Sequence, residues 1–238
     1  SAKLYEEAGH LVNILAEQDL KNMKEKSERV GWSISIDMIK CLEKARQKNV
    51  IRHWVAEHKM PLPPYSVLGA VLNQMLSSSS DAQPLVSWSG VELRRFNKKL
   101  YLFSVDFDDS SHIIDRKKGI SSSAKFSISW DGVSRILLPN NSSLSTKISS
   151  AGGLKIHKKN IIEIRFRGGG ERCKPFGRSG SNTLKKLFQE HNLEPWLRNK
   201  VPLVYVDGIL AAVGDLWVCD DFFALANETG VELKWSFF

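Results

Sequence analysis

The spacing of apolar residues changes once along this chain of 238 residues, and this change restricts the folds that it can adopt. Before residue 77 the apolar side chains recur every three or four positions, as at Leu4, Ala8, Leu11 and Leu15, which is the pattern of amphipathic helices. This pattern predicts a first helix that ends near residue 23 and further helices over residues 36–47, 50–58 and 65–76. The serine-rich segment 77–81 predicts a linker, and beyond it apolar and polar residues alternate as they do in strands.

The second part of the chain is predicted to consist of strands and one helix. Short segments rich in β-branched and aromatic residues predict strands at 84–88, 91–96, 99–105, 126–130, 134–138, 161–166, 201–206, 209–213, 217–219 and 231–237. The pairs Asn97-Lys98, Asp131-Gly132 and Asp207-Gly208 predict hairpin turns, and residues 181–191 predict a helix. We therefore expect an α+β chain with a helical domain at 1–80 and a mixed, mostly antiparallel β domain at 81–238, with a core motif at 160–222. The strand order within 106–159 stays open.

The charge of the chain favours an anionic partner. There are 34 Lys and Arg residues against 26 Asp and Glu residues, which gives a net charge of +8 and a pI near 9.4. Such a balance is typical of proteins that meet nucleic acid or an acidic surface, although basic enzymes without such a partner also exist. No apolar run approaches the ~18 residues needed to span a bilayer, and the first residues carry no signal-peptide pattern. We expect a cytoplasmic protein without a membrane partner.

The residues that carry catalytic or metal chemistry are scattered. Cys41, Cys173 and Cys219 are too few and too far apart in sequence to predict a disulfide framework or a metal site. No histidine pair has the spacing of a zinc-binding helix. The sequence therefore predicts no catalytic residue and no metal site in this chain.

The positive charge is concentrated in residues 163–203, where nine Lys or Arg residues stand against four Glu residues. The first half of this stretch is rich in glycine, and an amphipathic helical pattern fills the second half. Backbone N–H groups of a glycine-rich loop and the charged forks of arginine both suit phosphates. We therefore predict that Arg172, Lys174 and Arg178, in the loop 168–178, contact RNA. The alternative is a solvated surface loop whose glycines only form turns.

The predicted helix that follows this loop has two different faces. Leu184, Leu187 and Phe188 share the spacing of a buried stripe and are expected to pack on a sheet. Lys185 and Lys186 project away from that stripe, so we predict that they continue a phosphate track from the loop. Ser181 or Asn182 is expected to cap the start of the helix, and an ordinary pair of surface lysines is the alternative interpretation.

Further basic residues extend this prediction in both directions along the chain. After the helix, Trp196 is expected to close a core, and Arg198 to contact RNA. In the helical domain, Lys48 and Arg52 lie in a segment with few acids, where a solvated helix face is the default interpretation and RNA contact the alternative. Arg94 and Arg95 are adjacent on a short strand, so one of them should face solvent, and which one is not fixed by the sequence. We include both of them, with Lys48 and Arg52, in the predicted RNA contact.

The motifs of the basic stretch resemble a known family. The runs E-R-C-K-P-x-G-R (171–178), S-x-x-L-K-K-L-F-Q-E (181–190), P-W-L-R (195–198), V-P-L-V-Y (201–205) and G-D-L-W-V-C (214–219) are similar to the C-terminal domain of tRNA(Ile)-lysidine synthase over residues 160–222. Upstream, A-R-Q-K-N-V-I-R-H-W-V-A-E-H-K-M-P-L-P (45–63) resembles the helical substrate-binding domain of that family, and V-E-L-R-R-F (91–96) fits between the two.

This resemblance implies a role for the chain and a missing part. The family's chemistry is carried out by an N-terminal ATP-pyrophosphatase domain with a Ser-Gly-Gly-x-Asp-Ser loop, and that motif does not occur in the sequence, which begins in a helical pattern without an initiator Met. The resemblance thus implies the C-terminal portion of an enzyme that uses ATP to join lysine to the wobble cytidine of tRNA-Ile. ATP, Mg²⁺ and L-lysine would belong to the N-terminal domain, and this chain would need no cofactor of its own.

The partners implied by the resemblance are tRNA-Ile and the chain's own N-terminal catalytic domain. The helical domain would hold the anticodon side of the tRNA and the β domain its acceptor side. Two other classes stay open, namely a stand-alone RNA-binding module without associated catalysis and a basic small-molecule enzyme. The sequence gives no oligomeric state.

Overall fold

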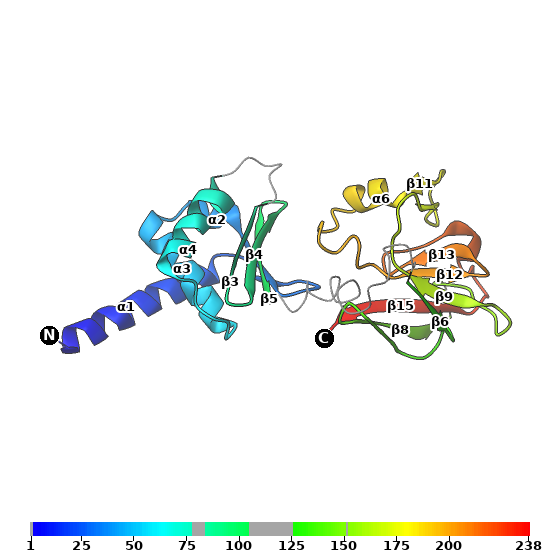
Figure 1. Cartoon of the computed structure of the whole chain (residues 1–238), viewed down its shortest axis with the longest axis horizontal. Coiled ribbons are helices and arrows are strands. Elements are labelled where there is room, and N and C mark those ends of the chain that lie inside the picture. The colour runs from blue at the N-terminus through cyan, green and yellow to red at the C-terminus, as the bar shows by residue number, and fades with distance from the viewer. Residues whose placement is uncertain (1, 78–83, 105–125, 151) are drawn as a thin grey trace, which may run out of the picture. The chain divides into compact units, whose positions relative to one another are not determined.

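The computed structural model describes residues 2–77, 84–104, 126–150 and 152–238, and it divides into two compact units, Ser1–Asp109 and Ser110–Phe238 (Figure 1). Each unit combines helix with antiparallel strands, so the expected α+β class is found. The expectation of a purely helical first domain is wrong, because the first unit also contains a five-stranded sheet. The larger part of the predicted linker 77–81 lies outside the described residues.

The helices of the first unit follow the predicted periodicity with one exception. They are α1 (Ala2–Lys21), α2 (Ile36–Lys40), α3 (Lys44–Glu57) and α4 (Tyr65–Ala70), which continues as the π-helix η1 (Val71–Leu76). The helix predicted over 36–47 is wrong, since the chain leaves helical geometry after Lys40 and starts α3 at Lys44. At this break the side chain of Gln47 donates a hydrogen bond to the carbonyl of Leu42 at 2.8 Å. Apolar spacing does not reveal such a contact.

The sheet of the first unit joins segments from both sides of the predicted linker. Its strands are β1 (Lys26–Ser27), β2 (Trp32–Ser35), β3 (Leu85–Trp88), β4 (Val91–Phe96) and β5 (Lys99–Ser104), arranged in the order β1-β2-β5-β4-β3. Strand β2 was not predicted, and it pairs with β5 so that Ile34 faces Leu100. This pairing draws residues 85–104 into the first unit, and the compact unit therefore extends to Asp109 instead of ending at residue 80.

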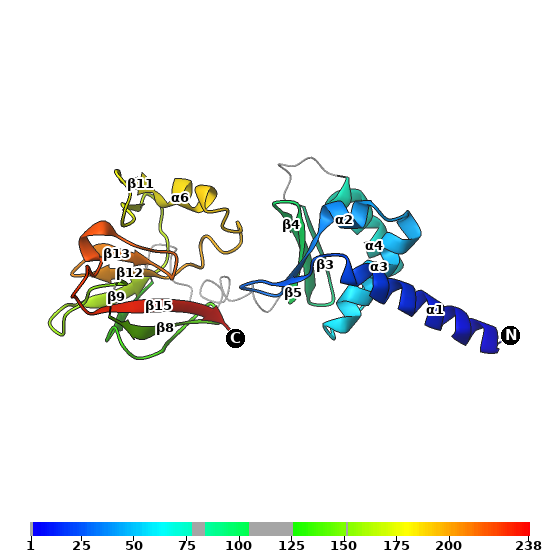
Figure 2. The same cartoon turned by 180° about the vertical axis from the view of Figure 1, so that it is seen from behind.

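One hydrophobic core holds the helices of the first unit on the sheet. The helices α2, α3 and α4 lie on one face of the strands in both views (Figures 1 and 2). Trp54 of α3, Met75 of η1, Ile34 of β2 and Leu93 of β4 are at most 1% exposed within one buried cluster. Gly31 allows the turn between β1 and β2, because it adopts φ +64° and a Cβ there would lie 2.0 Å from the carbonyl oxygen of Leu102.

The described residues of the second unit contain three antiparallel sheets and one short α-helix. Its elements are β6 (Ser127–Trp130), β7 (Ile136–Leu138), β8 (Ser142–Ser149), β9 (Ile162–Arg165), β10 (Arg172–Cys173), β11 (Asn182–Thr183), α6 (Leu184–Glu190), β12 (Leu203–Val206), β13 (Ile209–Val213), β14 (Trp217–Val218), the 3-10 helix η3 (Asp220–Phe222) and β15 (Gly230–Phe237). The strand orders are β14-β13-β12-β9-β6, β15-β8-β7 and β10-β11.

Of the two hairpins predicted in the second unit, the structure confirms one and contradicts the other. The hairpin of β12 and β13 is confirmed, with Asp207 and Gly208 both at positive φ in its turn. The hairpin predicted at Asp131-Gly132 is wrong, because β6 pairs with β9 while β7 pairs with β8. The chain only bends at this point, where Gly132 adopts φ +76° and the Asp131 carboxylate accepts the backbone N–H groups of Val133 and Ser134. This side-chain cap directs the chain into the second sheet instead of folding it back on β6.

Candidate nucleic-acid interface

The basic loop, residues 168–178, leads through β10 toward the helix α6 in the second unit (Figure 1). As predicted, the side chains of Leu184, Leu187 and Phe188 form the buried face of α6, while Lys185 and Lys186 are exposed. The expected cap is wrong by one or two positions, since the hydroxyl of Thr183 accepts the N–H of Lys186. The two lysines thus belong to the surface of a helix whose opposite face is fixed in the core.

The glycine turn of the basic loop already holds a carboxylate. Glu171 Oε1 accepts the backbone N–H of Gly168 at 2.6 Å and that of Gly169 at 3.0 Å, and Oε2 accepts the latter also, at 3.1 Å. These are the N–H groups that the sequence assigns to a phosphate. The structure therefore gives the turn an internal anion, which leaves the exposed cations around it as the groups of this loop that could contact a phosphate.

Each predicted cation of the basic loop has a partner within the second unit. Arg172 donates through Nη2 to the carbonyl of Ser181 at 2.8 Å, which places its guanidinium beside the start of β11. Lys174 Nζ lies 2.6 Å from Asp220, and this hydrogen bond raises the pKa of Lys174. Arg178 Nη1 lies 2.6 Å from Glu190, where its hydrogen bond lowers the pKa of the Glu190 carboxyl. All of these pairs are solvent-accessible, so an RNA phosphate can compete for the cations at modest cost.

Arg198 is held differently from the cations of the loop. Its Nε donates to the carbonyl of Leu193 at 2.9 Å. Burial lowers the pKa of Arg198, and the positive charge of Arg167 lowers it further. Arg167 itself lies 3.9 Å from Glu171, and its buried Nε has no hydrogen-bond partner among the residues that the structure describes. Sequence reasoning did not select Arg167, although its position just before the glycines was a usable signal.

In the first unit, the four predicted residues range from exposed to buried. Arg52 is exposed on α3, and Lys48 donates to the hydroxyl of Tyr65 at 2.8 Å. Arg94 is half-buried and donates to Glu92 at 2.8 Å. Arg95 is only 8% exposed, and its Nη1 donates to the carbonyl of Met75 at 3.0 Å. The guanidinium of Arg95 thus serves the core, and we remove Arg95 from the predicted interface.

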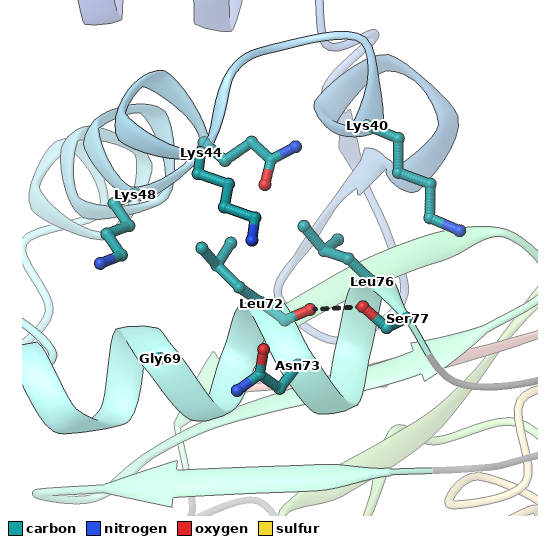
Figure 3. Close-up of a pocket in the computed structure, with 9 residues that line it drawn as sticks. Lys40, Lys44, Lys48, Gly69, Leu72, Asn73, Leu76 and Ser77 are labelled. Atoms are coloured by element: carbon teal, nitrogen blue, oxygen red, sulfur yellow. Dashed lines mark hydrogen bonds between the residues drawn. The ribbon is translucent and has the colours of Figure 1, made fainter.

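Two lysines that were not selected lie beside Lys48. Lys40 and Lys44 line a pocket together with Lys48, between α3 and the continuous helix of α4 and η1 (Figure 3). The signal in the sequence was their spacing, because residues 40, 44 and 48 recur every four positions. The predicted helix 36–47 placed the first two on one helix, whereas the structure divides them between α2 and α3.

Two of the three cysteines lie together in the interior of the second unit. Cys173 Sγ and Cys219 Sγ lie 2.6 Å apart in the interior, and their hydrogen bond lowers the pKa of Cys173 and raises that of Cys219. Within the described residues, no group of three or more His, Cys, Asp or Glu side chains could hold a metal ion. In the same part of the chain, no helix is both long and apolar enough to cross a membrane.

Two family models match the chain, one in each unit. Residues 35–101 match the TilS substrate binding domain, and residues 162–235 match the TilS substrate C-terminal domain. The chain belongs to the TilS family. The two matched TilS domains contain every predicted interface residue, from Lys48 to Arg198.

Relatives from several bacteria, all named tRNA(Ile)-lysidine synthase, support this assignment. The tRNA(Ile)-lysidine synthase of Coxiella burnetii is 34% identical over 232 residues, which cover 97% of this chain and 48% of the relative. That of Methylococcus capsulatus is 27% identical over 86% of this chain and 44% of the relative. The chain therefore spans about half the length of the curated relatives that it matches. A crystal structure of a TilS C-terminal domain aligns over 48% of this chain and 98% of its own, with a TM-score of 0.32 and 17% identity.

Proposed function

We propose that this chain is the part of a tRNA(Ile)-lysidine synthase that binds and positions tRNA-Ile. The observation that carries the proposal is the pair of TilS domain matches, in which each matched region also contains exposed basic side chains. In the complete protein, ATP would activate the wobble cytidine and lysine would then be joined to it. ATP, Mg²⁺ and lysine would be held by a catalytic domain outside this chain.

The interface would act through phosphates instead of base edges. Arg172, Arg178, Lys185 and Lys186 are exposed on the basic loop and α6, where they can reach a nucleic-acid backbone. Phosphate contacts fix the register and orientation of a nucleic acid without reading its sequence. Holding the tRNA in one orientation would bring its anticodon to a distant reaction centre, and correct orientation lowers the barrier of a reaction between two bound groups.

The proposal is tested with the double variant Arg172→Glu and Arg178→Glu. Its affinity for tRNA-Ile should fall at least about tenfold, because two attractive charges become repulsive, and the dependence on salt should become shallower. A matched control carries Lys158→Glu and Lys159→Glu, which change the same charge at exposed positions outside the basic loop. Fluorescence anisotropy at two salt concentrations measures both variants, with circular dichroism to verify folding.

Three RNAs decide between the proposal and its alternative. Whole tRNA-Ile, an acceptor-stem minihelix and an unrelated duplex are titrated with the unmodified chain. Preference for the whole tRNA supports the synthase role. Equal affinity for all three RNAs contradicts it and favours a stand-alone RNA-binding module. Equal losses in the loop variant and its control would show that the basic loop is not the contact.

A further inference from the structure

A pocket of 580 Å³ lies in the first unit between two helical walls (Figure 3). Lys44 and Lys48 extend from α3 on one side, and Lys40 flanks them from the end of α2. The helix that carries Gly69 and Asn73 forms the opposite side. The lining residues include no carboxylate, so the three ammonium groups give the pocket a positive charge that no lining acid offsets.

The ammonium groups are available to a ligand. Lys44 and Lys48 are one helical turn apart and therefore lie on the same face of α3. Among the described residues, Lys40 and Lys44 form no ion pair. Lys48 donates to the hydroxyl of Tyr65 and lies 4.2 Å from the centroid of that ring, so its ammonium group must leave this exposed contact to bind a ligand. These side chains are flexible point charges, and such charges suit anions whose exact orientation varies.

The opposite wall has an unusual backbone. η1 is a six-residue π-helix, and π-helical turns are rare and occur frequently at functional sites. Ser77 donates from its hydroxyl to the carbonyl of Leu72, five residues earlier, at 3.3 Å. Asn73 presents its side-chain amide to the pocket (Figure 3). A Cβ placed on Gly69 would meet no atom within 4 Å, which leaves open space along this wall.

We propose that this lysine pocket binds consecutive backbone phosphates of an RNA strand. The proposal rests on the proposed function and assigns it a second contact, separate from the basic loop. Three lysines along one wall match a row of single negative charges, and the Asn73 amide can bond a ribose hydroxyl. The lining contains no glycine-rich turn to enclose a terminal phosphate and no aromatic ring, and the ring of Tyr65 beside it is covered by the Lys48 ammonium, 4.2 Å from the ring centroid. Those absences from the lining favour a continuous strand over a free nucleotide.

The test uses the full chain with Lys40→Ala and Lys44→Ala together. The logarithmic dependence of RNA affinity on salt should become shallower by about 2, one unit for each lost phosphate contact, and the affinity at about 0.1 M salt should fall about tenfold. The matched control carries Lys3→Ala and Lys98→Ala, an equal charge change at exposed positions that do not line the pocket. Its salt dependence should stay that of the unmodified chain.

A second measurement on the unmodified chain does not depend on the variants folding. The side-chain amide signal of Asn73 in nuclear magnetic resonance spectra should shift when RNA is added. Inorganic tripolyphosphate, which offers the same phosphate chemistry without a strand, should shift it only at much higher concentration. Tighter binding of tripolyphosphate than of RNA would overturn the proposal, since the pocket would then be a polyphosphate site.

The remaining outcomes separate this proposal from the proposed function. If the native chain binds RNA while neither the salt dependence of the pocket variant nor the Asn73 signal changes, the pocket proposal is wrong and the basic loop keeps its role. If the pocket variant and its control change equally, general charge explains the effect and the pocket proposal is again wrong. If the native chain binds no RNA, the proposed function fails and the pocket fails with it.

Discussion

Glu171 places its carboxylate in the glycine turn that the sequence assigns to a phosphate. Replacing Glu171 with Gln keeps an oxygen that can accept the N–H groups of Gly168 and Gly169 but removes a negative charge beside Arg167. We expect the affinity for RNA to rise about threefold, because removing this carboxylate charge weakens the repulsion of RNA phosphates by less than about 1 kcal/mol. Anisotropy titration measures this change at low salt, where the difference is least screened.

A second capping glutamate in the same unit supplies the control for this change. Glu228 accepts the backbone N–H of Leu225 and pairs with Lys155, so it has the same kind of contacts away from the basic loop. Glu228→Gln should leave RNA affinity as it is in the unmodified chain. An equal rise in both variants would mean that overall charge, and not the glycine turn, controls the affinity.

Arg95 is the predicted interface residue that the structure assigns to the core. Arg95→Met should lower the free energy of unfolding by about 2 kcal/mol, because the Met75 carbonyl loses a buried charged donor, and should leave the RNA affinity of the folded chain unchanged. Arg52→Met, on the exposed face of α3, should give the opposite pair of results, with unfolding changed by less than about 0.5 kcal/mol. Urea unfolding and RNA titration of both variants measure these two effects. A loss of RNA affinity in folded Arg95→Met would contradict the assignment of Arg95 to the core.

Single positions show where sequence reasoning reaches its limit. The exposure of Lys185 and Lys186 follows from helical spacing alone and is confirmed. The choice between Arg94 and Arg95 could not be made, because adjacent strand residues face opposite sides and the sequence does not say which side holds a helix. The contact of Glu171 with the glycine turn was also hidden, since an acid among basic residues gives no sign of what it accepts.

At the scale of elements, Glu28 ties the β1–β2 hairpin to β5. Burial alone would raise the pKa of the Glu28 carboxyl, but hydrogen bonds from Lys99 at 2.7 Å and Ser33 at 2.6 Å, together with the charges of Lys99 and Lys26, lower it overall. Since the pKa of the folded state lies below that of the unfolded chain, the charged carboxylate stabilises the fold above the unfolded value of about 4.3. This contribution disappears as the pH falls through the lowered folded pKa.

The matching prediction uses Glu28→Gln. At pH 7 the free energy of unfolding of the variant should be about 1 kcal/mol lower than that of the unmodified chain. The difference should shrink toward zero as the pH falls through the lowered pKa of the folded Glu28 carboxyl. Urea unfolding at a series of pH values between about 3 and 7 measures it. Glu17→Gln is the control, because Glu17 is an exposed partner of Lys21 on α1 and should change stability little at any pH. A constant difference across the pH range would show that Glu28 acts by packing instead of charge.

Turns and helices were easier to predict than the pairing of strands. Asp207-Gly208 forms the predicted hairpin turn with both residues at positive φ, whereas at Asp131-Gly132 only Gly132 adopts positive φ and no hairpin forms. Their strands differ, since β12 pairs with the neighbouring β13, whereas β6 pairs with β9 more than thirty residues later. Strands so far apart in sequence pair because together they complete a hydrophobic core, and local sequence patterns do not show this. The strand β2 was missed for the same reason. The spacing of apolar residues likewise does not predict that the second half of the helix 65–76 is a π-helix.

At the scale of the whole molecule, the two units share the charge very unequally. Residues 1–109 contain 15 Lys or Arg and 14 Asp or Glu residues, whereas residues 110–238 contain 19 and 12. Of the net charge of +8, the second unit thus carries +7 and the first unit +1. Long-range attraction of RNA should therefore come from the second unit, while the lysine pocket gives the first unit only a local positive site.

The two units, produced separately as residues 1–109 and 110–238, should show this division directly. Each has its own sheet, and the first has a closed hydrophobic core, so we expect each to unfold cooperatively on its own. The logarithmic salt dependence of RNA affinity should be steeper for the second unit than for the first. The whole chain should bind more tightly than either unit, since the second contact becomes intramolecular once the first has formed. An equally steep salt dependence in the first unit would place the main phosphate contacts on the lysine pocket instead of the basic loop.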